Sequence, residues 1–142
     1  MAYNCVFCQI VQGQLPASVA YEDDTVIAFM DIMPINPGHV LVVPKTHFTE
    51  LSDMDEDTGA QLFSVAMKIE RALRKAGIRC EGINLMQNNG AAAFQEVMHV
   101  HLHVIPRYRG DGVSVHFGQQ KATRESLDQI AKQIKTNLPN ET

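Results

Sequence analysis

The sequence contains no apolar run that approaches the roughly 18 residues needed to span a membrane, and its N-terminus lacks a basic segment followed by an apolar one. It also lacks internal repeats, low-complexity tracts and linkers. The net charge of −4 argues against broad, charge-driven binding to nucleic acid. We therefore expect a cytoplasmic protein that binds neither membranes nor nucleic acid polymers.

Cysteine is scarce in this chain. Its three cysteines are an odd number, so a disulfide framework is not expected, and Cys80 is interpreted as a structural thiol. The remaining composition is that of an ordinary globular protein, with 45% hydrophobic and 20% charged residues. A chain of 142 residues is long enough to bury a substantial core. We expect a single domain that covers residues 1–142.

Three histidines stand at every second position in the segment 98–106, with aliphatic residues between them. This alternation predicts a strand on which His99, His101 and His103 share one face while the aliphatic residues enter a core on the other. Three imidazoles along a fairly straight strand converge on one metal with difficulty, so we expect a division of labour. One end histidine would hold a metal, and the others would serve proton transfer or nucleophilic attack. The alternative is a metal-binding tag or an edge strand with solvated histidines.

Cys5 and Cys8 form a C-x-x-C pair close to the N-terminus. A redox pair of the thioredoxin type would follow a strand and open a helix, and no strand precedes this pair. A zinc site fits better, but it needs two further ligands from distant parts of the chain, for which His47 and His99 are the candidates. Without them the pair would be a free dithiol.

The spacing of hydrophobic residues distinguishes the predicted strands from the predicted helices. It repeats every two residues in strands and about every 3.6 residues in helices. The run at 39–44 is almost wholly apolar and is expected to be a central strand, and Pro106 is expected to end the last strand. Acidic residues near Asp53 and basic residues near Lys75 suit the dipole of a long helix between them. We expect strands at 18–22, 25–31, 39–44, 82–87 and 95–105, and helices at 7–12, 53–76 and 123–138.

The loops before and after the histidine segment differ in their expected role in ligand binding. The loop at 88–90 leads towards the histidines, and its Asn-Asn-Gly sequence can bring backbone and amide donors close to a ligand; a plain turn is the alternative. The glycine-rich segment 107–120 is expected to be a loop, with His116 as a surface residue. The helix after it carries an apolar stripe formed by Leu127, Ile130, Ala131 and Ile134.

The segment 99–105, His-Val-His-Leu-His-Val-Ile, resembles the signature of the histidine triad (HIT) superfamily. The resemblance covers nearly the whole chain, in family order and at family spacing. It includes the blocks Cys5–Ile10, Ala28–Ile32, Pro37–Lys45, Asn88–Gly90 and Ile105–Tyr108. The C-x-x-C pair makes the chain similar to the zinc-containing branch of histidine triad nucleotide-binding proteins, a phosphoramidase-like group.

The resemblance implies an α+β protein with the HIT fold. That fold has a five-stranded antiparallel sheet and two main helices, and it forms a homodimer in which the two sheets join. The resemblance also implies one cofactor, a structural Zn²⁺ held by Cys5, Cys8, His47 and His99. Four such ligands leave no open position, which is typical of a structural zinc site.

The resemblance further implies a catalytic arrangement. By similarity, His101 attacks the α-phosphorus of a nucleotide and forms a nucleotidyl-histidine intermediate that water resolves, while His103 and His39 contact the phosphate. The implied substrate contacts are Asn88, Gln95 and the Val97 amide at the phosphate, Asp31 at the ribose hydroxyls, and Phe29 and Ile10 at the base.

Two residues depart from the family pattern. Phe94 stands where a glycine is usual, and Glu96 stands where a serine or threonine is frequent and is proposed to help the leaving group. A carboxylate near a phosphate is repulsive unless it is protonated or turned away.

We predict a zinc-containing, homodimeric nucleotide hydrolase that cleaves a purine nucleoside 5′-phosphoramidate, built on AMP or GMP, or a related nucleotidyl compound. A dinucleoside polyphosphate hydrolase is the alternative within the same chemistry. A non-catalytic nucleotide-binding adaptor is the alternative from another class.

Overall fold

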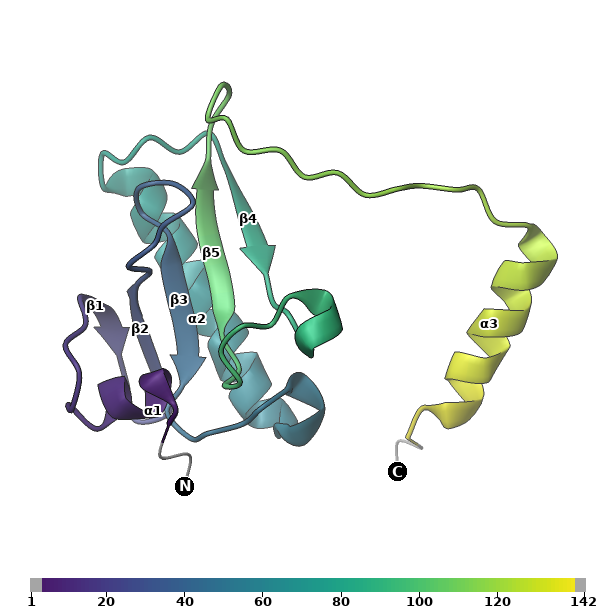
Figure 1. The fold of residues 1–142 in the computed structure, drawn as a ribbon, viewed down its shortest axis with the longest axis horizontal. Coiled ribbons are helices and arrows are strands. Elements are labelled where there is room, and N and C mark those ends of the chain that lie inside the picture. The colour runs from purple at the N-terminus through teal and green to yellow at the C-terminus, as the bar shows by residue number, and fades with distance from the viewer. Residues whose placement is uncertain (1–3, 140–142) are drawn as a thin grey trace.

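The fold is centred on one antiparallel sheet with the strand order β1-β2-β3-β5-β4 (Figure 1). The computed structural model describes residues 4–139. The elements are α1 (Val6–Val11), β1 (Val19–Glu22), β2 (Val26–Met30), β3 (Val40–Pro44), α2 (Glu56–Lys75), β4 (Gly82–Met86), β5 (Leu102–Arg107) and α3 (Arg124–Asn137), with 3-10 turns at Leu51–Asp53 and Ala91–Ala93. The predicted α+β class and the five antiparallel strands are confirmed. The single domain over residues 1–142 stays a prediction.

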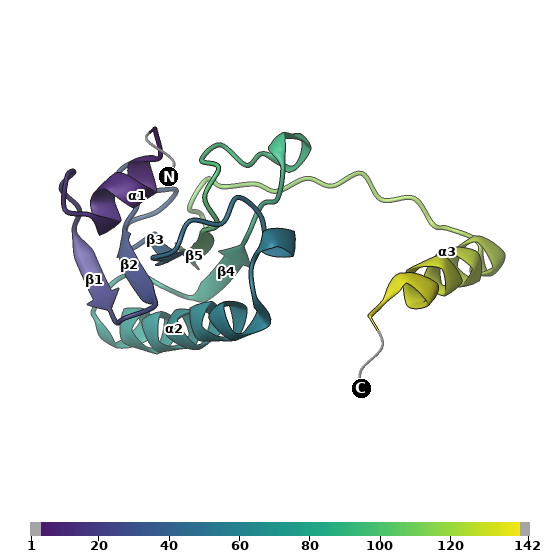
Figure 2. The ribbon, with the colours of Figure 1, turned by 90° about the horizontal axis from the view of Figure 1, so that it is seen from below.

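The helix α2 covers one face of the sheet (Figure 2). It begins at Glu56 because the Asp55 carboxylate accepts a hydrogen bond from the Thr58 N–H at 2.9 Å and so caps the first turn. This start lies three residues after the predicted Asp53, which belongs to the preceding 3-10 turn. The core between α2 and the sheet contains Val26, Ala28, Val40, Val42, Leu62, Val65, Ala66, Ile69, Leu73, Val100 and Val104.

The other face of the sheet carries α1 on one side and the loop between β4 and β5 on the other (Figure 2). Alternate residues of β2 and β3 point to this face, because side chains along a strand alternate between its two sides. They form a second, smaller core that includes Phe7, Phe29 and Val43. His101 and His103 border a cavity that residues of α1 and of this loop also line.

The strand prediction for the histidine segment was partly wrong. A strand was expected at 95–105, but β5 covers Leu102–Arg107, and the Val100 N–H donates to the Phe48 carbonyl at 2.7 Å instead of to a neighbouring strand. Pro106 lies inside β5 rather than at its end, since β3 pairs only as far as Val104 on that side. The predicted alternation nevertheless holds, because Val100 and Val104 are fully buried against α2 while the histidines face the other way.

The helix α3 stands apart from the sheet at the end of an extended connection (Figures 1 and 2). It is a helix as predicted, but every residue from 114 to 139 is exposed, and the apolar stripe is uncovered within one copy. Within residues 4–139, no helix has the length and apolar character needed to cross a membrane. The expected cytoplasmic location stays a prediction.

Candidate functional site: a metal cluster and a histidine-lined cavity

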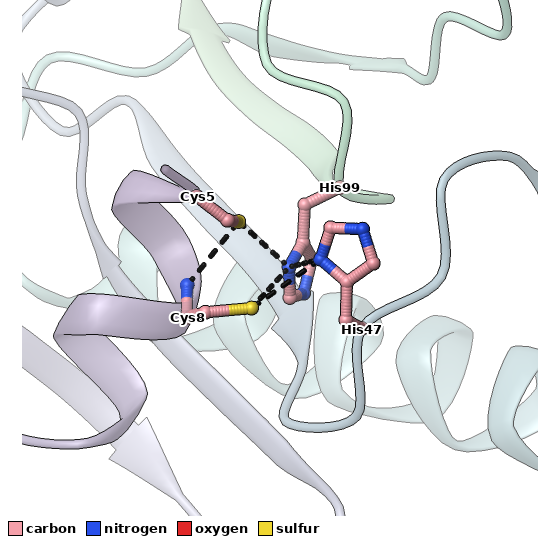
Figure 3. Close-up of side chains that lie close together, drawn as sticks. All are labelled: Cys5, Cys8, His47 and His99. Atoms are coloured by element: carbon pink, nitrogen blue, oxygen red, sulfur yellow. Dashed lines mark hydrogen bonds between the residues drawn. The ribbon is translucent and has the colours of Figure 1, made fainter. Parts of the chain in front are cut away.

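Four side chains from three separate segments converge beside α1 (Figure 3). The Cys5 Sγ lies 3.3 Å from the His99 Nδ1, and the Cys8 Sγ lies 3.3 Å from the His47 Nδ1. The two Nδ1 atoms are 3.1 Å apart, and all four donor atoms lie within 4.8 Å of one another. The structure thus brings together the four residues that the sequence analysis singled out as metal ligands.

The donor set fits a tetrahedral zinc ion. Ligand atoms that are about 2.0–2.3 Å from such an ion lie about 3.3–3.8 Å from one another. Four of the six separations here are 3.1–3.5 Å, and all six are within 4.8 Å. Burial, together with neighbouring Cys5, raises the pKa of Cys8 to about 11, so the thiol stays protonated near neutral pH until a cation displaces its proton. Burial lowers the pKa of His99 to about 4, which keeps the imidazole in the neutral form that binds metals.

A backbone carbonyl fixes which nitrogen of His99 faces the cysteines. The His99 Nε2 lies 2.8 Å from the Pro44 carbonyl oxygen, and a carbonyl only accepts hydrogen bonds. The Nε2 therefore carries the proton, and the Nδ1 presents its lone pair to the cluster. The end of β3 in this way orients a metal ligand that lies 55 residues away in the sequence.

The same kind of bond fixes His101, but through the opposite nitrogen. The His101 Nδ1 donates to the His99 carbonyl at 2.7 Å, so the Nε2 keeps a free lone pair. The ring packs edge-on against Phe7, with 5.0 Å between ring centroids, and it borders the cavity described below. Burial lowers the pKa of His101, and the carboxylates of Asp31 and Glu96 oppose this shift only in part. His101 is thus a neutral imidazole held in one tautomer.

His39 and His103 form a hydrogen-bonded relay next to His101. The Ile35 N–H donates to the His39 Nδ1 at 3.1 Å, so the proton of neutral His39 is on Nε2. That Nε2 donates to the His103 Nδ1 at 2.9 Å and lies 3.6 Å from the Asp31 carboxylate. His103 must then carry its own proton on Nε2. Burial lowers the pKa of both His39 and His103, the latter to about 4, with His101 adding to the shift of His103.

His39, His101 and His103 border one cavity of about 690 Å³. Its walls come from α1, β2, the loop before β3, and the segment between β4 and β5. Several of the predicted catalytic and substrate-binding residues line the cavity. They are Ile10, Phe29, Asp31, His39, Asn88, Val97, His101 and His103. Eight of the nine residues that the sequence analysis assigned to catalysis or substrate binding therefore border one space.

Gln95 is the residue that the structure does not bring to the cavity. Its side chain is buried, its Oε1 accepts from the Gly90 N–H at 2.7 Å, and its Nε2 donates to the Thr49 carbonyl at 2.6 Å and to the Val97 carbonyl at 3.1 Å. These bonds hold the loop that carries Val97. A contact between Gln95 and a phosphate stays a prediction.

Several residues of the cavity wall were not predicted from the sequence. Phe7 packs edge-on against the rings of both His99, a member of the metal cluster, and His101. Ile32 and Met33, which are 94% and 82% exposed, also line the cavity. Two adjacent large apolar residues directly after Asp31, in a segment rich in turn residues, were a signal in the sequence that could have indicated a ligand surface.

The cavity has an acidic character. Asp31 and Glu96 are among its lining residues, and no lysine or arginine is among the described residues that line it. Its three histidines have lowered pKa values and are neutral near pH 7. A phosphate bound here would be held by hydrogen bonds from neutral donors and not by fixed positive charge.

The chain belongs to the HIT domain family, whose model matches residues 12–110. An uncharacterized HIT-like protein of Methanocaldococcus jannaschii is 47% identical over 131 residues, which cover 92% of this chain and 98% of that protein. The adenosine 5′-monophosphoramidase hnt1 of Schizosaccharomyces pombe is 31% identical over 95% of this chain and 98% of its own length. The structure also resembles a zinc-bound histidine triad family protein from Mycobacterium smegmatis, with a TM-score of 0.75, 41% identity and coverage of 94% of this chain and 96% of the other.

These comparisons confirm the family that the sequence resembled and the fold class that it implied. The family match begins at residue 12, after the C-x-x-C pair, and includes all of the histidines that form the two clusters. Family membership and the histidine-lined cavity together define a HIT domain protein with a candidate ligand site.

Proposed function

We propose that this protein is a zinc-containing nucleotide hydrolase that cleaves purine nucleoside 5′-phosphoramidates, or related nucleotidyl compounds, through a covalent intermediate on His101. The proposal is supported by the tautomer of His101, whose Nδ1 is bonded to the His99 carbonyl so that Nε2 is free to act as a nucleophile. This bond is the observation that carries the proposal. The related phosphoramidase from Schizosaccharomyces pombe supports the substrate class.

The reaction consists of two displacements at phosphorus. The His101 Nε2 lone pair forms a bond to the α-phosphorus while the P–N bond of the phosphoramidate breaks, and the leaving nitrogen takes that electron pair and a proton from water. A second water then attacks the phosphorus and gives its proton to the hydroxide that the first water left. The bond between phosphorus and His101 breaks, its electron pair returns to Nε2, and the nucleoside monophosphate is released.

The neutral relay supplies hydrogen bonds to the phosphate. Because His39 donates to the His103 Nδ1, the His103 Nε2–H is free to donate to a phosphate oxygen in the cavity. Asn88 and the Val97 amide are proposed as further donors, Asp31 as the acceptor for the ribose hydroxyls, and Phe29 with Ile10 as the apolar contact for the base. Gln95 supports this arrangement by holding the loop around Gly90.

Zinc has a structural role in this proposal. Cys5, Cys8, His47 and His99 would hold the ion, and its four ligands leave no position for substrate. The ion would tie α1 to the residue whose carbonyl orients His101. Through this link, the metal site supports the nucleophile without taking part in the reaction.

The proposed enzyme is tested by measuring amine release from adenosine 5′-phosphoramidate, together with AMP binding by calorimetry. His101→Ala should abolish turnover and keep AMP binding, because the variant loses the nucleophile and leaves the base and ribose contacts in place. His116→Ala, which changes a histidine on the exposed connection to α3, is the control and should keep full activity. A wild-type protein that binds AMP but releases no amine would contradict the proposal and support the adaptor function.

We also propose that the protein is a homodimer. The strand β4 ends the sheet, so its outer backbone groups have no strand partner within one copy. On α2, Lys68 lies over the Tyr21 ring of β1, and successive residues of a helix are rotated by about 100°. Phe63 and Met67 therefore lie on the opposite flank, towards β4, and they are 54% and 42% exposed.

The helix α3 supports the same conclusion. Leu127, Ile130 and Ile134 are 43%, 51% and 58% exposed, and an isolated helix of this length is marginal in water. A second copy is proposed to cover this stripe and the flank of α2. Light scattering should give twice the monomer mass of 15.8 kDa, and Phe63→Glu combined with Ile130→Glu should give the monomer. A wild-type protein that is monomeric at high concentration would contradict the dimer.

A further inference from the structure

Phe94 has a backbone conformation that a phenylalanine rarely adopts. Its φ of 68° and ψ of 25° lie in the left-handed region, and it is the only non-glycine residue with a positive φ within residues 4–139. Its side chain is 84% exposed, so no packing within the protein compensates for this conformation. The ring borders the same cavity as His101. A strained, exposed aromatic ring at the wall of a binding cavity indicates a contact with a ligand.

The position of Phe94 along the sheet shows which part of a ligand it would meet. The proposed base and ribose contacts, Phe29 and Asp31, belong to β2 or follow it directly, and they lie on one side of the histidines. Phe94 and Glu96 follow β4, which is on the other side of β5 in the strand order. A nucleotide with its base near β2 and its phosphorus at His101 therefore directs its other phosphorus substituent, the leaving group, towards Phe94 and Glu96.

The charges of the cavity restrict the leaving group further. Glu96 lies on the leaving-group side, and its carboxylate is close enough to His101 to act on it electrostatically. No lysine or arginine among the described residues lines the cavity, so nothing there offsets the negative charge of Asp31 and Glu96. A leaving group that is itself a phosphate chain would be repelled, whereas an amine, which becomes a cation after release, would be attracted.

We propose that Phe94 and Glu96 select the leaving group, favouring an organic amine with an aromatic or other large apolar body and rejecting anionic leaving groups. This inference rests on the proposed function and specifies its substrate class. The ring of Phe94 stacks on the apolar body of the amine. When the P–N bond breaks, nitrogen keeps the electron pair and takes one proton from water to give the neutral amine; a second proton from solvent then gives the ammonium ion, which the Glu96 carboxylate attracts. The two departures from the family pattern thereby act together.

The test compares kcat/KM for three substrates that share the adenylyl group. These are the 2-phenylethylamidate of AMP, the methylamidate of AMP, and diadenosine triphosphate, whose leaving group is ADP. Wild type should prefer the phenylethylamidate over the methylamidate by about tenfold, and Phe94→Gly should remove this preference. Glu96→Gln should raise the rate with diadenosine triphosphate, relative to the methylamidate, by about tenfold.

Two matched variants serve as controls. Phe117→Gly removes an aromatic ring that is 79% exposed outside the cavity, and Glu125→Gln removes an exposed carboxylate on α3; both should keep the wild-type ratios. Phe94→Gly should fold with an equal or higher Tm, because glycine adopts the left-handed conformation without strain.

The outcomes separate this inference from the proposed function. Equal rates for the two amidates in wild type, or a preference that survives Phe94→Gly, would overturn the role of Phe94 while leaving the hydrolase intact. An unchanged rate ratio for diadenosine triphosphate in Glu96→Gln would overturn the role of Glu96. A wild-type protein that cleaves none of the three substrates would overturn the proposed function itself.

Discussion

His99 and His101 are separated by a single residue, and both are fixed by a hydrogen bond to a backbone carbonyl, yet the two bonds use opposite nitrogens. His99 donates from Nε2 to Pro44 and offers Nδ1 to the cysteines, whereas His101 donates from Nδ1 to His99 and keeps Nε2 free. The difference shows that the carbonyl which each ring meets decides its chemistry. In the proposed function, the first imidazole is a metal ligand and the second is the nucleophile.

The loss of a metal ligand should have the largest effect on the stability of the protein. Cys8→Ala removes one zinc ligand and is expected to lower the free energy of unfolding by on the order of 4 kcal/mol, as losses of structural metals do. Metal analysis of the purified protein should find about one zinc per wild-type chain and much less in the variant. Cys80→Ala is the control, since Cys80 lies outside the cluster. Equal zinc content and equal stability in Cys8→Ala would contradict the metal site.

After the loss of His101 itself, the loss of the hydrogen-bond donor at His103 should reduce kcat most strongly. His103→Ala removes the Nε2–H that is proposed to bind the phosphate and should lower kcat by about a hundredfold, similar to the loss of one oxyanion donor. Zinc content should stay at the wild-type level, because His103 is not part of the metal cluster. A loss of zinc in this variant would show that the two clusters are not separate.

The relay between His39 and His103 should have a smaller effect. His39→Leu keeps most of the side-chain volume but removes the donor to the His103 Nδ1, so a part of His103 should change tautomer and kcat should fall by about tenfold. Nitrogen NMR of His103 reports the tautomer directly and would not respond to a general loss of packing. An unchanged tautomer together with a reduced kcat would contradict the role of His39 as a positioning residue.

The smallest effect should come from a carboxylate that lies outside both clusters. Arg107, which donates at 2.6 Å, holds the pKa of Asp111 well below its usual range, with help from the Val113 N–H and from Asn36. A lowered pKa contributes stability that is present above about pH 4, the unfolded value, and is lost as the pH falls below it. Asp111→Asn should therefore lower the Tm at pH 7, and the difference from wild type should shrink below pH 4. A constant difference across this range would contradict the ion pair.

The sequence predicted the alternation of the histidine segment because side-chain direction depends only on a period of two. It did not predict where β5 begins, since the Val100 N–H bonds to Phe48, a partner that no local pattern indicates. The tautomers of His99 and His101 could not be predicted either, because they depend on backbone carbonyl groups that come close to the two rings only in the folded chain. Phe94 stood out in the sequence as a departure, but its left-handed backbone is visible only in the structure.

The Nε2 of His101 is the atom on which the proposed reaction depends most directly. Wild-type protein mixed with an adenosine phosphoramidate, quenched within milliseconds and digested, should yield an adenylyl adduct that maps to His101 by mass spectrometry. Phosphorus–nitrogen coupling in a ¹⁵N-labelled sample should assign the bond to Nε2, and the adduct should be absent from His101→Ala. An adduct on His103, a bond through Nδ1, or amine release without any adduct would contradict the account.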